Sequence, residues 1–200
     1  AISQAGAFNN NGTFTDSNGF DSAINAGGGG GIFNNFGTFN KQSSTTTAVG
    51  TQFNSTGTVN VNAGTMLMNG GGTNTGVFNV ANGAKLEYRN GSHTMNSVTT
   101  SGAGTFEIST ENVGADATVA LNGGTHTTAF VLSGSVLTGT SHTYHGLKTW
   151  SGGAITGDAA AWSPSLKARP SEGSTPSTRN ASTVTNAPER RSGAAPPLRR

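Results

Sequence analysis

The sequence predicts an all-β fold in which the chain winds into a β-solenoid of parallel strands, and three observations lead to this prediction. A short phrase recurs: residues 8–14 read FNNNGTF, residues 33–39 read FNNFGTF and residues 53–59 read FNSTGTV. The phenylalanines that open these phrases, followed by Phe78, are separated by 25, 20 and 25 residues, a spacing typical of one solenoid coil. Between them lie short runs in which apolar and polar residues alternate, and helical patterns are absent.

Each alternating run reads as a strand of about five residues with every second side chain on one face. The strands are expected at residues 58–62, 65–69, 84–88, 105–109 and 118–122. One coil cannot bury its few apolar side chains alone, so we expect each coil to stack on the next and build a continuous narrow core. The side chains expected to point inward are Val59, Val61, Met66, Met68, Leu86 and Tyr88.

Glycine and asparagine mark the expected corners between strands. Glycine permits the positive φ that a sharp corner requires, and asparagine tolerates it better than most residues. We therefore expect the phenylalanine of each phrase to enter the core, Asn and Gly to turn the chain, and Thr to begin the next strand. The positions expected to repeat in this way are Phe8, Gly12, Phe14, Phe33, Gly37, Phe39, Phe53, Gly57, Phe78, Gly83 and Gly104.

The Asn-Gly pairs leave a second fold open. Six such pairs occur, and Asn-Gly is also the strongest short-range signal of a β-hairpin. An antiparallel sandwich or barrel with hairpins at these pairs is therefore the alternative. The recurrence at coil spacing favours the solenoid, as do corners that carry Phe-Gly or Thr-Gly where a two-residue hairpin would need Asn-Gly.

The composition is unlike that of an ordinary enzyme. Charged residues make up 10% of the 200 residues, against about a quarter in typical domains, while glycine accounts for 31 and cysteine for none. Few groups are left for acid–base catalysis, and disulfides and thiolate metal sites are excluded. No apolar run approaches the roughly 20 residues that a membrane helix needs, so we expect no transmembrane segment.

The composition changes near residue 160, which divides the chain into two expected regions. Residues 1–158 are the expected solenoid, and they read as a piece of a longer array because they begin without Met or a signal segment. Residues 159–200 contain all six prolines and are expected to form a disordered tail. The abrupt change also fits a shifted reading frame, which is the alternative to a genuine tail.

Charge is divided in the same way. The chain through residue 160 carries four basic and seven acidic residues, a net charge of −3, and the last forty residues carry seven basic and two acidic residues, a net charge of +5. The basic pI therefore belongs to the tail. Because its arginines are scattered without aromatic residues, we expect no nucleic-acid partner.

Two carboxylates fall one coil apart: Glu87 in KLEYR and Glu107 in TFEIS. If Leu86 and Phe106 stack inside, the two carboxylates project outward on adjacent coils, as the acid and base of a glycan-cleaving β-helix would. The competing interpretation is a solvated strand face on which Lys85, Glu87 and Arg89 neutralise one another. The second is favoured because no motif places a third polar group nearby.

No cofactor and no metal site is expected. Neither of two acidic pairs matches a calcium-loop motif, and both are interpreted as turn residues: Asp16 with Asp21, and Glu111 with Asp116. The histidines lack zinc-binding spacing: His93, His126, His142 and His145. His142 and His145 could share a metal, but surface side chains on Thr-rich strands are the favoured interpretation.

Four stretches within residues 5–157 share one arrangement, in which a short alternating strand is followed by Asn or Gly and then by Gly-Thr. They read FNNNGTF, GTVNVNAGTMLMNGGGTNTGVFNVANGAKLEY, SGAGTFEIS and TWSGGAITG. This arrangement resembles the β-strand repeats of large bacterial surface proteins, especially the passenger regions of autotransporter-type and haemagglutinin-type adhesins. The resemblance implies a right-handed parallel β-helix that is exported to the cell surface or medium, and it places no catalytic residue on this chain.

We therefore expect a non-enzymatic structural or adhesive segment of a bacterial cell-surface or secreted repeat protein, associated with the outer membrane or released from the cell. Its expected partners are glycans, other cell surfaces or further copies of the chain, bound through many weak polar contacts. Trp150, Tyr144 and Tyr88 are the side chains most able to stack on a sugar if they are exposed. The alternatives are a polysaccharide lyase or glycosidase that uses Glu87 and Glu107, and a matrix protein that assembles through open strand edges.

Overall fold

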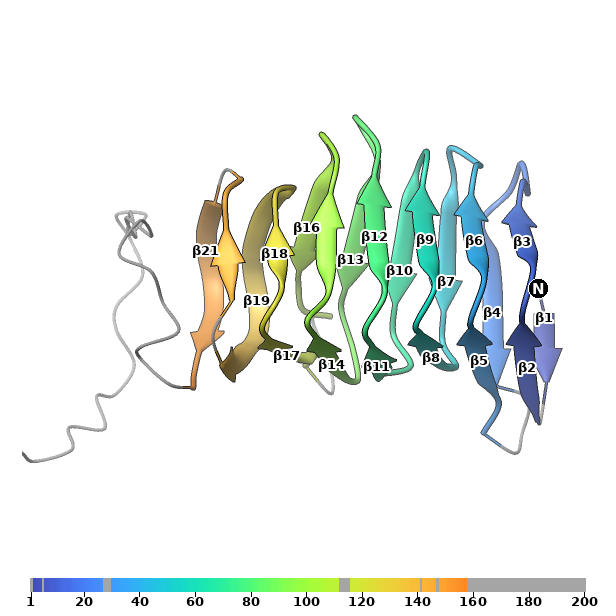
Figure 1. The fold of residues 1–200 in the computed structure, drawn as a ribbon, viewed down its shortest axis with the longest axis horizontal. Coiled ribbons are helices and arrows are strands. Elements are labelled where there is room, and N and C mark those ends of the chain that lie inside the picture. Colours follow the sequence, from blue (N-terminus) through green and yellow to red (C-terminus); the bar gives the residue numbers. More distant parts are fainter. Residues whose placement is uncertain are drawn as a thin grey trace, which may run out of the picture. The chain divides into compact units, whose positions relative to one another are not determined.

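The computed structural model describes residues 2–4, 6–26, 30–111, 116–140, 142–146 and 148–157. Within these residues the chain is all-β and winds through about six turns of a parallel β-solenoid (Figure 1). The predicted solenoid is thus confirmed, and the antiparallel alternative is wrong because every described strand pairing is parallel. The expected tail, residues 159–200, lies outside the described residues.

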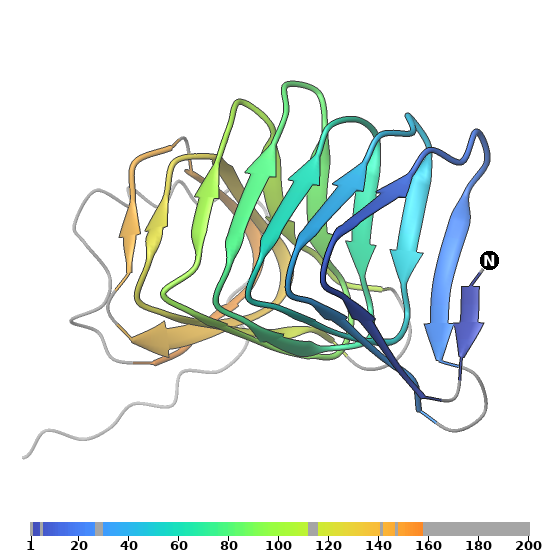
Figure 2. The ribbon, with the colours of Figure 1, turned by 45° about the vertical axis from the view of Figure 1, so that its right-hand side comes forward.

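Each turn of the solenoid contributes one strand to each of three faces (Figure 2). The first face contains β1 (Ile2–Gln4), β4 (Ser22–Ala26), β7 (Thr46–Val49), β10 (Thr65–Met68), β13 (Lys85–Tyr88), β16 (Thr105–Ile108) and the first part of β19 (Ala129–Thr140). The second face contains β2 (Ala7–Asn10), β5 (Ile32–Asn35), β8 (Gln52–Ser55), β11 (Gly72–Asn74), β14 (Ser92–Asn96), β17 (Thr118–Asn122) and the last part of β19. The third face contains β3 (Thr13–Asp16), β6 (Thr38–Lys41), β9 (Thr58–Val61), β12 (Val77–Val80), β15 (Thr99–Ser101), β18 (Thr125–His126) and β20 (Thr143–Tyr144).

The first and second faces are joined because β19 runs through both, and β21 (Lys148–Ile155) pairs with it along its length. The bend in β19 falls at Ser135, whose φ of 65° is in the left-handed region. Its hydroxyl oxygen accepts a hydrogen bond from the backbone N–H of Ala117 at 3.0 Å and donates to the carbonyl of Ser109. These two bonds compensate for the unfavourable backbone conformation of a non-glycine residue.

The recurring phrase is the corner between the second and third faces. Phe8, Phe33 and Phe53 pair in register on β2, β5 and β8, and successive rings stack with centroids 4.9 and 5.4 Å apart. The residues that follow them turn the chain, and a threonine begins β3, β6 and β9, as predicted. Phenylalanine therefore builds a continuous column inside the solenoid, where offset or tilted rings contact favourably.

The fourth member of this spacing, Phe78, was assigned to the wrong face. It lies on β12 in the third face, paired with Val59, whereas the next coil places Gly72 against the Phe53 backbone. The column of Phe78 begins instead with Phe14 and Phe39 on β3 and β6. The spacing of 25, 20 and 25 residues misled the prediction because both faces carry phenylalanine and the coils vary in length.

The predicted inward side chains are confirmed, but the interior is not purely apolar. Val59, Val61, Met66, Met68, Leu86 and Tyr88 are each 0% exposed. Polar residues also point inward and are buried, at Asn10, Asn35, Lys41, Asn74, His93 and His126.

Close approach of successive coils, and not a positive φ, explains two of the corner glycines. A Cβ on Gly57 would lie 2.0 Å from the carbonyl oxygen of Gly37, and one on Gly37 would lie 2.1 Å from that of Gly12. Neither residue has a left-handed φ, whereas Gly83 does, at 76°. The predicted role of glycine is thus correct at Gly83 and wrong at Gly37 and Gly57, where the absence of a side chain is what matters.

Candidate functional site

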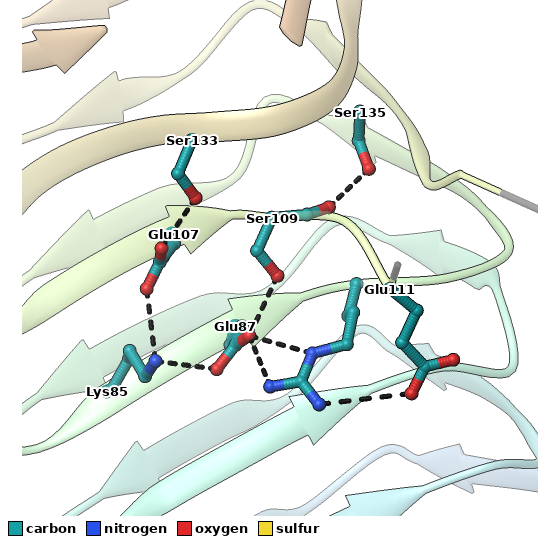
Figure 3. A network of polar contacts seen from close by, with 8 residues as sticks. Lys85, Glu87, Glu107, Ser109, Glu111, Ser133 and Ser135 are labelled. Atoms are coloured by element: carbon teal, nitrogen blue, oxygen red, sulfur yellow. Dashed lines mark hydrogen bonds and ion pairs between the residues drawn. The ribbon is translucent and has the colours of Figure 1, made fainter. Parts of the chain in front are cut away.

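The two carboxylates that the sequence placed one coil apart lie side by side on the first face. Glu87 on β13 pairs in register with Glu107 on β16. Strand alternation turns Leu86 and Phe106 into the core, where each is 0% exposed, and directs the carboxylates to the outer surface. We call the group formed by Lys85, Glu87, Arg89, Glu107 and Glu111 the ion-pair network (Figure 3).

Glu87 is the centre of this network. Its Oε1 atom accepts hydrogen bonds from Arg89 Nε at 3.0 Å, from Arg89 Nη2 at 2.7 Å and from Ser109 Oγ at 2.7 Å. Its Oε2 atom lies 2.7 Å from Lys85 Nζ, and the side chain is only 3% exposed. Both carboxylate oxygens of Glu87 are therefore occupied by groups of the protein itself (Figure 3).

Glu107 is tied to the same cation. Its Oε2 atom lies 3.0 Å from Lys85 Nζ, and its Oε1 atom accepts a hydrogen bond from Ser133 Oγ at 2.7 Å. At the other end of the network, Arg89 Nη1 lies 3.9 Å from Glu111 Oε1. The network thus joins β13 and β16 to β19 across successive coils.

The electrostatic balance of the network keeps its central groups ionised. Burial raises the pKa of Glu87, but hydrogen bonds from Lys85, Ser109 and Arg89 outweigh burial, and the pKa lies below its ordinary value. Burial lowers the pKa of Lys85, but its contacts with Glu87 and Glu107 outweigh that effect and the pKa is raised. Neither group exchanges a proton easily near neutral pH.

This geometry is poorly suited to acid–base chemistry on a glycan. A glycosidase needs one carboxyl group whose pKa is raised so that it can donate a proton, and space between the two carboxyl groups for the scissile bond. Here the pKa of Glu87 is lowered, and Lys85 Nζ contacts the Oε2 atoms of both glutamates. The arrangement favours the second interpretation from the sequence, in which the charges of the strand face neutralise one another. The expectation that this face is solvated is wrong at Glu87, which is buried.

Of the acidic pair near the N-terminus, Asp16 lines a cavity of about 330 Å³, whose wall also includes Phe20. Asp16 is 9% exposed and accepts hydrogen bonds from Asn18 N at 3.2 Å and from the Thr47 hydroxyl. Asp21 accepts one from Thr46 N at 2.8 Å. Within the described residues no group of three or more His, Asp or Glu side chains is arranged to hold a metal ion.

The prediction that the histidines lie on the surface is wrong for two of them. His93 on β14 is 1% exposed and His126 on β18 is 0% exposed. His126 Nδ1 lies 3.0 Å from Thr100 Oγ1, and its ring stacks on Tyr144 with centroids 4.6 Å apart. Burial lowers the pKa of each histidine to about 4, and for His126 the proximity of His142 adds to the effect. Both imidazoles therefore act as neutral core groups at pH 7.

Sequence reasoning missed a buried lysine. Lys41 on β6 is 0% exposed, and its ammonium donates to the carbonyl oxygen of Ser43 at 2.5 Å and to Ser43 Oγ at 2.7 Å. Burial lowers its pKa, and Asp16 and Asp21 oppose that effect. The signal was available in the sequence, because the alternation of TFNK directs its last residue inward and the coil spacing places it opposite Asp16.

Asparagine side chains form ladders from coil to coil. On the outer surface of the third face, Asn60 Nδ2 donates to Asn40 Oδ1 at 2.8 Å, and Asn79 Nδ2 donates to Asn60 Oδ1 at 2.8 Å. Inside the corner, Asn10 Nδ2 donates to Asn35 Oδ1 at 2.7 Å. Recurrence of asparagine at the coil period is the sequence signal of these ladders.

The aromatic residues considered for sugar stacking differ in how deeply their side chains are buried. Tyr88 is fully buried and Tyr144 packs against His126, whereas Trp150 on β21 is 42% exposed. Two phenylalanines at corners are more exposed still, Phe20 at 82% and Phe36 at 52%. Their exposure could not be predicted, because corner and core phenylalanines have similar neighbours in the sequence.

Comparisons with known proteins found no matching family model, no matching curated protein and no matching solved structure. The fold is therefore established by the strand pairing, and the resemblance to bacterial adhesins stays a prediction. The described residues contain no helix long and apolar enough to span a membrane.

Proposed function

We propose that this chain is a structural or adhesive segment of a bacterial cell-surface or secreted repeat protein and that it acts as a stalk or adhesin without catalysis. The observation that carries the proposal is the distribution of polar groups. Outward polar side chains run in files from coil to coil, as in the ladder of Asn40, Asn60 and Asn79, and do not converge on one pocket. Such a surface suits many weak contacts that add up through avidity.

The ion-pair network supports the same proposal. A buried carboxylate with every oxygen bonded contributes to holding coils in register, and removal of one partner of such a group is costly. Catalysis would need a carboxyl group able to exchange its proton, which the lowered pKa of Glu87 disfavours. A polysaccharide lyase or glycosidase on this scaffold is accordingly the weaker candidate.

The exposed aromatic residues indicate what an adhesive segment of this kind would contact. Trp150 and Phe36 are exposed on separate coils, and each offers a flat apolar ring to a partner. Exposed aromatic rings are suited to contact the apolar faces of sugars. Glycans on other cells are therefore the proposed partners, with the chain exported to the cell surface or medium.

Multivalent display separates an adhesin from a single-site binder or an enzyme. The full chain is coupled to beads, and attachment of the beads to cells and to immobilised glycans is measured beside the binding of the free chain. We expect the beads to attach and the free chain to bind far more weakly, because effective concentration rises steeply on multivalent surfaces. Attachment that fails at every bead density, or equally tight binding by the free chain, would contradict the proposal.

A further inference from the structure

The third face carries a file of threonines along its outer surface. In-register pairing places one residue from each strand in this file, and only one of the seven is not threonine: Thr13, Thr38, Thr58, Val77, Thr99, Thr125 and Thr143. A second file, two residues further along the strands, contains Thr15, Asn40, Asn60, Asn79 and Ser101. We call these two files together the Thr/Asn surface.

The two files differ in how their polar groups are used. The amides and hydroxyl of the second file bond to one another, as in the bond from Ser101 Oγ to Asn79 Oδ1 at 2.6 Å. The threonine hydroxyls of the first file have no side-chain hydrogen bond to the protein among the described contacts, for example at Thr38, Thr58 and Thr99. The second file therefore holds the surface in place, while the first offers free hydroxyl and methyl groups to a partner.

The Thr/Asn surface is regular in two directions. Neighbouring strands lie about 4.8 Å apart, and residues two positions apart along a strand are separated by about 6.6 Å. The pairings of these seven strands show no register shift, in contrast to the pairing of β19 with β21 (Figure 1). Stacked phenylalanine rings and asparagine ladders are the kind of device that keeps a many-stranded sheet flat.

The chemistry of this surface excludes several kinds of partner. The strand positions that face outward carry no charged side chain within the described residues, so nothing there would attract phosphates or an anionic surface. They carry no aromatic ring either within the described residues, so no side chain on this face could stack on a sugar. The charged and aromatic side chains of β3, β6 and β12 point inward, as Asp16, Lys41 and Phe78 show.

We propose that the Thr/Asn surface binds ice. The occupant is a crystalline array of water, whose rows of oxygen atoms repeat at distances close to the two spacings of this surface. Each free threonine presents a hydroxyl that bonds to water and a methyl group that orders the water around it. The adhesive role proposed above draws on the asparagine ladder of this face and on exposed rings elsewhere, whereas ice binding rests on the free threonines of the first file, so the two proposals are tested separately.

A substitution in the middle of the file gives the sharpest test. In Thr58→Tyr, a bulky ring stands on β9 at the centre of the surface, and aromatic residues are well tolerated on strands. The matched control is Thr65→Tyr, an outward threonine of the first face. Thr125→Lys, at an exposed position near the end of the file, is the second variant and adds a charge without crowding the central strands.

The measurements are made on the full chain. They are the gap between melting and freezing points of a single ice crystal, ice recrystallisation, and incorporation of the labelled chain into growing ice. We expect the unmodified chain and Thr65→Tyr to slow recrystallisation and enter the ice, and Thr58→Tyr and Thr125→Lys to lose both effects. Thermal melts followed by circular dichroism show that each variant retains the fold.

Three outcomes would overturn the proposal. The first is an unmodified chain that shows no freezing gap and is excluded from ice. The second is a loss of ice binding in Thr65→Tyr as large as in Thr58→Tyr. The third is a surface that does not bind ice but causes self-association in sedimentation, or binds insoluble neutral polysaccharide, and loses that property in Thr58→Tyr. The occupant would then be a second copy of the chain or a glycan.

Discussion

In-register stacking builds both the ion-pair network of the first face and the asparagine ladder of the third face. The two differ in whether the stacked side chains attract or repel one another. In-register parallel coils place like residues opposite like residues, so Glu87 meets Glu107 just as Asn60 meets Asn79. An amide is self-complementary, because its N–H donates to the oxygen of the next amide. Two carboxylates repel, and Lys85 must lie between them.

The comparison explains why charge is scarce in the solenoid. A file of amides or hydroxyls can continue over many coils without any compensating partner, whereas each stacked carboxylate needs a cation within reach. The network meets this need with Lys85 on the same strand as Glu87, with Arg89 directly after that strand, and with serines on the two following coils. Four changes test the difference between the ion-pair network and the asparagine ladder.

Acid is expected to cause the largest loss of folding stability, because it protonates two histidines in the core shared by the two faces. The pKa of His93 and of His126 is about 4 in the folded chain and 6.5 in the unfolded chain, so the unfolded state binds more protons between these values. Stability should fall as the pH drops from 6.5 toward 4, by roughly 3 kcal/mol for each histidine. Urea unfolding at several pH values measures this loss, and His126→Phe should remove about half of it. A stability that is flat over this range would contradict the burial of both imidazoles.

Gly57→Ala should break the stacking that both faces share. The added Cβ would collide with the carbonyl oxygen of Gly37 on the preceding coil, and we expect a loss of about 3 kcal/mol of stability because backbone must move. Gly12→Ala is the matched control, since the same corner of the first coil has nothing within 4 Å of the new Cβ. Chemical denaturation compares the two variants, and equal losses would show that close approach is not the reason for glycine here.

Glu87→Gln should weaken the network by about 2 kcal/mol. The loss is below that of a fully buried pair because the side chains of Lys85 and Arg89 are 34% and 32% exposed. Glu107→Gln, at a more exposed carboxylate, should cost less. In the unmodified chain the same contribution is present above pH 4.5 and is lost as the pH falls through the lowered pKa of Glu87. A Glu87→Gln variant as stable as the parent would remove the structural role assigned to this residue.

Asn60→Ala should have the smallest effect, about 1 kcal/mol, because it removes two neutral hydrogen bonds from a half-buried position. Unlike the loss in Glu87→Gln, this one should be independent of pH and of salt. Thermal melts at low and high salt separate the two variants. A salt-dependent loss for Asn60→Ala would erase the distinction between the two faces.

The fold could be predicted largely from the sequence, because the residues that enter the core, turn the chain and begin a strand recur at the period of one coil. The strand alternation around Val59 and Leu86 and the corner after Phe53 were read correctly. The assignment of Phe78 failed because the sequence does not reveal which face a strand occupies once coil lengths vary. The role of Gly57 failed because the distance to the coil before it is a property of the stacked structure alone.

The position of the candidate site could be predicted from the sequence, but its hydrogen-bond partners could be predicted only in part. The coil spacing predicted that Glu87 and Glu107 would meet, and strand alternation predicted Lys85 and Arg89 beside them. The contribution of Ser109 and Ser133 could not be anticipated, because it depends on the rotamers of hydroxyls on the following coils. Burial of Lys41 was readable from alternation but runs against the usual exposure of lysine.

We infer that the paired glutamates are structural, and we propose that the chain acts without catalysis. The most direct test is an assay for reducing ends and unsaturated ends released from a panel of polysaccharides, with the unmodified chain and Glu107→Gln side by side. We expect no release above buffer from either protein, together with a lower melting temperature for Glu107→Gln. Release by the unmodified chain that disappears in a folded Glu107→Gln variant would contradict it.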